Sequence, residues 1–81
     1  MNSFYCVVSF PLKDWNHRET DDQIVEFCKQ KGYNRIGSGA GFGFRDLEFD
    51  SFKTKDEFKQ FAKDLREQFP FVTSITLHDY D

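Results

Sequence analysis

The spacing of apolar residues between Thr54 and Pro70 constrains the fold of this chain more than any other feature. The apolar positions fall 3, 4, 7 and 11 residues after the first of them, and they are Phe58, Phe61, Ala62, Leu65 and Phe69. This spacing places them on one face of a helix. Thr54 and Glu57 have the spacing of a capping box at the start of that helix, and Pro70 ends it. The helix must therefore bury an apolar stripe against a second layer of structure.

A second amphipathic helix is predicted earlier in the chain. Thr20 and Gln23 repeat the capping-box spacing, and Gly32 supplies a typical C-terminal stop. Its buried stripe is formed by Ile24, Val25, Phe27 and Cys28. Four segments rich in β-branched and aromatic residues are predicted as strands: Ser3 to Phe10, Tyr33 to Ser38, Phe42 to Phe49 and Val72 to His78. The glycines between the second and third strands are assigned to a turn.

The predicted order is strand, helix, strand, strand, helix, strand within 81 residues. Because each helix has one stripe to bury, both are expected on one face of a four-stranded antiparallel sheet. This α+β arrangement resembles the ferredoxin-like sandwich, and the resemblance spans residues 1–81 as a single domain. Eleven phenylalanines, three tyrosines and one tryptophan supply an aromatic core. The start at Met1 suggests a whole gene product.

Composition narrows the class of protein. No apolar run approaches the roughly 20 residues that span a bilayer, and the N-terminus lacks a basic region before an apolar stretch. We therefore expect a cytoplasmic protein with no membrane segment. The net charge of −3 argues against broad phosphate binding. Cys6 and Cys28 are interpreted as buried free thiols, with a disulfide between them as the alternative.

A run of alternating glycines lies beside the third predicted strand and consists of Gly37, Gly39, Gly41 and Gly43. Glycine permits a sharp turn or the close approach of another molecule. Leu47 and Phe49 alternate with acidic residues, so they are expected to face the helices. Carried back toward the N-terminus, this alternation predicts that Gly41, Gly43 and Arg45 lie under the helices. It predicts that Phe42 and Phe44 point away from them.

The face of the sheet away from the helices is then predicted to carry aromatic residues at its centre. This cluster consists of Tyr5, Phe42 and Phe44, with Val7 beside it. Its polar rim is formed by Asp46, Glu48, Ser74, Thr76 and His78. An apolar patch with a polar rim is typical of an interaction site. The alternative is a β-bulge after the glycines that reverses the register and buries Phe42 or Phe44.

The segment Gly41-Phe42-Gly43-Phe44 resembles the middle of the RNP1 segment of the RNA-recognition motif. In that family the two phenylalanines stack on bases, aided by an aromatic residue on the first strand. The resemblance implies that Phe42, Phe44 and Tyr5 bind single-stranded RNA. Ala40 stands where the consensus has a basic residue, and the acidic residues on the same strand would repel phosphates.

The sequence favours a non-enzymatic domain that binds a protein partner or a second copy of itself. The acidic balance suits a basic partner, because opposite potentials speed encounter. Some phage-encoded inhibitors of bacterial defence are small acidic domains, so a regulatory or inhibitory role is suggested by analogy. Trp15, in a polar loop, is interpreted either as a cap on the core or as an interface anchor.

Other classes of site find less support in the sequence. The glycines alternate strictly and do not open a helix, so no nucleotide-binding loop is predicted, although a cradle for a small ligand at Gly37 to Gly43 is a third candidate. His17 and His78 are too far apart for a metal-ligand spacing. Cys6 and His78 are predicted to point to opposite faces, which excludes a thiol–base pair. We therefore predict no catalytic residue, no metal and no cofactor.

Overall fold

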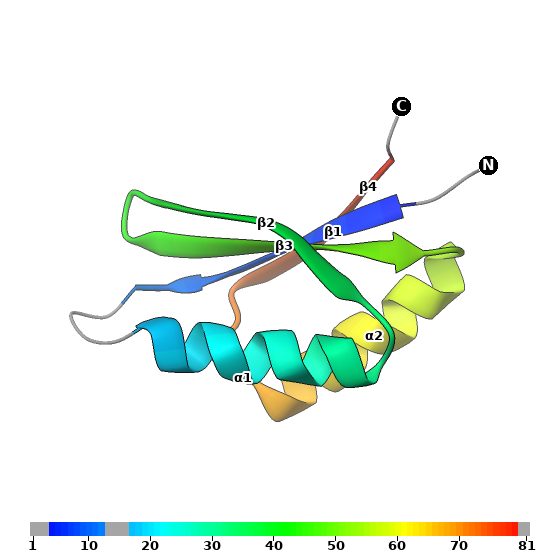
Figure 1. Cartoon of the computed structure of the whole chain (residues 1–81), viewed down its shortest axis with the longest axis horizontal. Helices are drawn as coiled ribbons and strands as arrows, with labels where there is room; N and C mark the ends of the chain where they lie inside the picture. The colour runs from blue at the N-terminus through cyan, green and yellow to red at the C-terminus, as the bar shows by residue number, and fades with distance from the viewer. Residues whose placement is uncertain (1–3, 13–16, 80–81) are drawn as a thin grey trace.

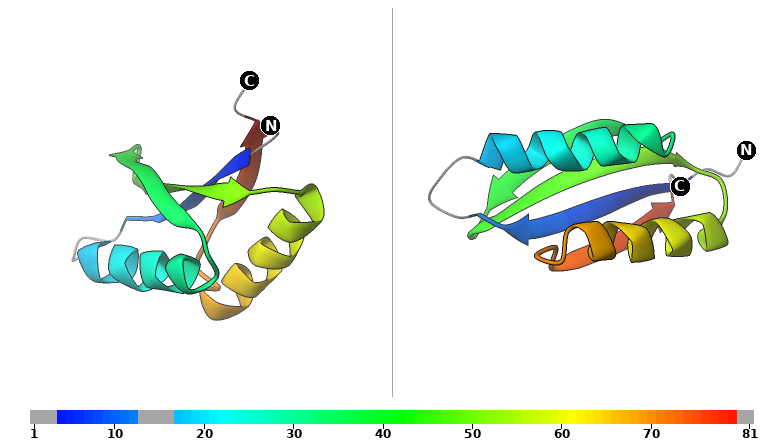
Figure 2. Two further views of the ribbon diagram at one scale, coloured as in Figure 1. Left: turned by 45° about the vertical axis from the view of Figure 1, so that its right-hand side comes forward. Right: turned by 90° about the horizontal axis from the view of Figure 1, so that it is seen from below.

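The computed structural model describes residues 4–12 and 17–79 (Figure 1). The elements in chain order are β1 (Phe4–Pro11), α1 (His17–Gln30), β2 (Asn34–Gly41), β3 (Phe44–Phe52), α2 (Lys55–Gln68) and β4 (Ser74–Asp79). The strands form one antiparallel sheet in the order β2-β3-β1-β4. Figure 2 shows both helices on one side of this sheet. The predicted α+β class is confirmed, and the strand order is compatible with a ferredoxin-like sandwich.

The core lies between the sheet and the two helices. The central strands contribute alternate residues up to Phe49, and the largest fully buried side chains of the described residues are Cys6, Val8, Ile24, Cys28, Leu47, Phe49, Phe52, Phe61 and Leu65. Cys6 and Cys28 are both free thiols, as predicted. Burial raises the pKa of the Cys6 thiol to about 12, so this sulfur stays protonated near neutral pH.

Helix α1 begins at His17, which places Thr20 inside the helix instead of at its cap. The predicted start was wrong because the Thr–Gln spacing also fits positions inside a helix, and a cap contributes only about 1 kcal/mol. The next residue, Asp21, forms a largely buried ion pair with Arg45. The predicted stop is confirmed: Gly32 has a φ of 95°, and Tyr33 donates its N–H to the Cys28 carbonyl at 2.9 Å.

The capping box at the start of α2 is present as predicted. The Thr54 hydroxyl accepts a hydrogen bond from the Glu57 N–H at 3.1 Å. The Glu57 carboxylate in turn accepts from the Lys53 N–H at 3.1 Å and from the Tyr33 hydroxyl at 2.6 Å. This single carboxylate therefore joins the start of α2 to the segment that leads from α1 into β2.

Glu57 is expected to make the fold less stable as the pH falls into the acid range. The bond from the Tyr33 hydroxyl is the main cause that lowers the pKa of the Glu57 carboxyl below its usual 4.5. A lowered pKa in the fold means that the ionised form is stabilising, and this stabilisation is lost as the pH falls through that pKa. We expect the difference in unfolding free energy between wild type and Glu57→Gln to shrink between about pH 6 and about pH 3. Urea unfolding at both pH values measures it, and a constant difference would contradict the assignment.

A candidate protein-interaction surface

The open face is the side of the sheet away from the helices (Figure 2), and all four strands contribute to it. In the central strands and β4 the residues on this face are Tyr5, Val7, Ser9, Pro11, Phe44, Asp46, Glu48, Asp50, Ser74, Thr76 and His78. The register places Val7 opposite both Glu48 and Thr76, and Ser9 opposite Asp46. Side chains opposite each other in antiparallel strands share a face, so these residues form one continuous surface.

The centre of the open face is acidic. Asp46 and Glu48 are half-buried neighbours on β3, and the Asp46 carboxylate accepts a hydrogen bond from the Ser9 hydroxyl. Asp50 continues the same alternation at the next position outward. Asp50 lies beyond the predicted end of this strand at Phe49, although the spacing Asp46, Glu48, Asp50 contains the signal. We name Asp46, Glu48 and Asp50 the acidic row.

The aromatic residues of the open face do not form the predicted central cluster. Tyr5 stacks on His78, with ring centroids 5.1 Å apart and an interplanar angle of 19°. Phe44 lies opposite Pro11, six residues along β1 from Tyr5 and therefore about 20 Å away. The predicted aromatic cluster was wrong because strand order alone does not tell which residues of neighbouring strands lie opposite each other. Val7, Ser9 and the acidic row occupy the space between the rings.

Phe42 does not belong to a strand. Phe42 and Gly43 are the central residues of the β2–β3 turn, with φ values of 53° and 82°, and the Phe42 side chain is 104% exposed. Positive φ at both positions is the signature of a type I′ turn, which favours Asn-Gly. A left-handed backbone costs a non-glycine residue about 1–2 kcal/mol. The predicted strand from Phe42 and the alternative of a buried Phe42 are both wrong.

The two-residue turn also reverses the predicted orientation of the glycines. Gly41 lies opposite Phe44, so the open face includes Gly41 together with Gly39 and Gly37, and Gly43 lies in the turn. The Glu48 carboxylate leans over Gly37, where an added Cβ would lie 3.2 Å from it. An added Cβ at Gly39 or Gly41 would contact nothing within 4 Å. From Gly37 to Gly41, the part of β2 on the open face therefore presents backbone without side chains.

Arg45 points toward the helices, as its alternation with Phe44 and Asp46 predicts. Its guanidinium donates two hydrogen bonds to one Asp21 oxygen, at 2.7 and 3.1 Å, and one to the other oxygen, at 3.3 Å. A fourth bond, also at 3.3 Å, reaches the Gly39 carbonyl. The side chains of Arg45 and Asp21 are only 14% and 6% exposed. This buried pair ties the β2–β3 hairpin to the first turns of α1.

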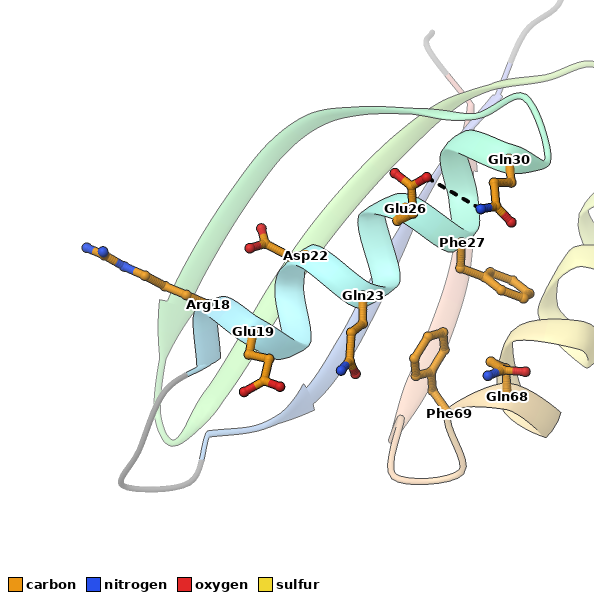
Figure 3. Close-up of a pocket in the computed structure, with 9 residues that line it drawn as sticks. All are labelled: Arg18, Glu19, Asp22, Gln23, Glu26, Phe27, Gln30, Gln68 and Phe69. Carbon is orange, nitrogen blue, oxygen red and sulfur yellow. Dashed lines mark hydrogen bonds between the residues drawn. The ribbon is translucent and has the colours of Figure 1, made fainter.

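A groove on the helical side of the molecule is a weaker candidate for a binding site. It lies between the outer side of α1 and the end of α2, and Figure 3 shows that Phe27 and Phe69 are its aromatic lining residues. The remaining lining side chains are polar or charged: Arg18, Glu19, Asp22, Gln23, Glu26, Gln30 and Gln68. The described residues contain no group of three potential metal ligands and no helix long and apolar enough to cross a bilayer. Trp15 lies outside the described residues.

Comparison with known proteins assigns no family. No family model matches the chain, no curated protein matches it, and no solved structure matches it. The fold class therefore rests on the strand order and helix placement alone. The resemblance of Gly41 to Phe44 to RNP1 gains no support, because the segment forms a hairpin turn in which Phe42 and Phe44 do not share a sheet face.

Proposed function

We propose that this protein is a non-catalytic interaction domain that binds a protein with a basic surface through its open face, as a regulator or inhibitor of that partner. The observation that carries the proposal is a complete sheet face that no described element covers. On it, the half-buried side chains of Tyr5 and Val7 lie beside the acidic row. This face therefore offers a partner both partly exposed apolar side chains and a row of carboxylates that complements basic groups.

Charge favours a protein partner over RNA. The acidic row occupies the central strand β3, where a bound nucleic acid would have to pass. Its carboxylates would repel phosphates, whereas lysine and arginine side chains of a protein would be attracted to them. The base-stacking pair that the RNP1 resemblance implies is also missing, because Phe42 stands at the tip of the hairpin. Binding of single-stranded RNA is therefore the alternative that the experiment below distinguishes from protein binding.

Charge also favours a different protein over a second copy of this chain. In a face-to-face dimer, the two acidic rows would lie against each other. Like charges brought together and desolvated are destabilising. The self-association considered from the sequence is therefore the less favoured form of the proposal. Sedimentation equilibrium of the purified chain measures it directly.

The test uses two variants with the same change in charge. Asp46→Asn with Glu48→Gln neutralises the centre of the open face, and amide oxygens still accept hydrogen bonds there. Asp22→Asn with Glu26→Gln is the matched control, because both residues are exposed on α1. Immobilised wild-type protein is first used to capture a basic protein from nuclease-treated host lysate. The captured partner is then purified and titrated with wild type and with each variant by calorimetry.

We expect the open-face variant to weaken binding at least tenfold and the control to change it less than about threefold, since loss of central charged contacts costs more than about 1.4 kcal/mol. Equal affinity of both variants for the partner would contradict the use of this face. Tight binding of a short oligouridine, weakening steeply with salt, would favour the RNA alternative instead.

A further inference from the structure

Phe42 combines two features that folding does not explain, a fully exposed aromatic side chain and a positive φ. Its side chain is fully exposed, so it buries no apolar surface in the fold. Its backbone has a φ of 53°, which phenylalanine adopts only with strain. Asparagine, aspartate or glycine at this turn position would relieve that strain. Strained residues that persist in a structure are a reason to look for a function at that position.

The turn that carries Phe42 is held in place from two sides. The Gly43 carbonyl accepts a hydrogen bond from the Leu12 N–H at 2.8 Å, which ties the tip to the end of β1. On the other strand of the hairpin, the Gly39 carbonyl accepts from the Arg45 guanidinium, which is itself bound to Asp21. The ring is therefore presented on a preorganised support, and little backbone entropy would be lost when it binds.

We propose that Phe42 is an anchor that inserts into an apolar pocket of the basic protein partner. This inference rests on the function proposed above and adds a second contact to it. The tip and the acidic row belong to the same hairpin, with Asp46 only two residues beyond Phe44. A partner seated on the acidic row therefore reaches the tip. A solvent-exposed aromatic ring that fills a pocket is a frequent hot spot of protein interfaces.

The same charges argue against a lipid surface as the occupant. Membrane surfaces facing the cytoplasm are negatively charged and attract basic segments. Beyond Phe44, the next residues of β3 on the open face are Asp46 and Glu48, which such a surface would repel. The exposed side of Phe44, 43% accessible, extends the apolar end of the hairpin and suits the wall of a protein pocket.

The test compares Phe42→Asn with Phe42→Leu. Asn-Gly is the preferred pair of a type I′ turn, so we expect Phe42→Asn to raise the melting temperature above that of wild type. The same variant should lose at least tenfold in affinity for the partner purified with wild-type protein. Phe42→Leu keeps an apolar side chain on the strained backbone, so its affinity should fall between those of the other two.

Further outcomes separate this inference from the proposed function. If Phe42→Asn binds the partner as tightly as wild type while Asp46→Asn with Glu48→Gln does not, the anchor is wrong and the open-face proposal stands. If wild-type protein retains no basic protein at all, both are wrong. Benzoylphenylalanine at position 42 should cross-link to apolar residues of the purified partner. Binding of wild type, but not of Phe42→Asn, to phosphatidylcholine–phosphatidylserine vesicles would overturn the protein pocket in favour of lipid.

Discussion

Replacing Asp21 with alanine is expected to lower the free energy of unfolding by about 3–5 kcal/mol, because it leaves the buried Arg45 guanidinium without its carboxylate. A domain of 81 residues has a total stability on the order of 4–12 kcal/mol. The expected loss is therefore a large fraction of the total stability. In a domain of this size each kcal/mol shifts the melting temperature by about 4–8 °C, so the effect is easily seen by circular dichroism.

Two controls identify the ion pair as the cause. Asp22→Ala changes the neighbouring exposed carboxylate and should alter stability by no more than about 0.5 kcal/mol. Asp21→Leu combined with Arg45→Leu removes both charges and should recover a large part of the loss, since apolar replacements of a buried pair are often neutral. A double variant as unstable as Asp21→Ala would show that the guanidinium is not the origin of the effect.

The ion pair also connects stability with the proposed function. Arg45 binds the Gly39 carbonyl and Asp21 at the same time, so this side chain joins the hairpin that carries the acidic row to α1. Without the Asp21–Arg45 ion pair, we expect the hairpin tip at Phe42 to be less well ordered. The tip would then lose backbone entropy when it binds a partner, which lowers the affinity.

The helices and their stripes could be predicted because periodicity alone determines which side of a helix is buried. The stop at Gly32 and the cap at Thr54 follow from backbone geometry that few residues satisfy. The start of α1 could not be predicted in this way. The helix begins at His17, three residues before Thr20, and the capping-box spacing at Thr20 and Gln23 gives no sign of this extension.

The region from Gly37 to Phe44 was the hardest to read from sequence. Alternating glycines carry no side chains, so they supply no hydrophobic pattern to fix which face they line. The turn was decided instead by Phe42 adopting a positive φ, a conformation that phenylalanine rarely takes. A two-residue displacement of the turn moved Phe42 off the sheet and put the bare glycines on the open face. The predicted outward direction of Asp46 and Glu48 did not depend on it, because Leu47 and Phe49 fixed that part of β3.

A bulge near the end of β3 escaped prediction for a related reason. The pairing with β1 shifts between Phe4–Phe52 and Cys6–Phe49, and Ser51 has a φ of 81°. The inserted residue turns Phe52 toward the helices, although strict alternation from Phe49 would place it on the open face. Serine gives no strong signal for this conformation. The bulge allows β3 to contribute a third apolar side chain to the core.

Phe52→Ala is therefore expected to destabilise the fold by about 3–5 kcal/mol, the usual loss for a fully buried phenylalanine. Its ring stacks on Tyr33 with centroids 4.0 Å apart and meets Phe61 at 4.9 Å, so truncation leaves a cavity among aromatic side chains. The matched control is Phe42→Ala, the same chemical change at a fully exposed site, which should cost nearly nothing in urea unfolding. Equal losses for the two variants would mean that Phe52 is not buried under the helices. Unequal losses in the expected direction would place the two rings in opposite roles, one in the core and one available to a partner.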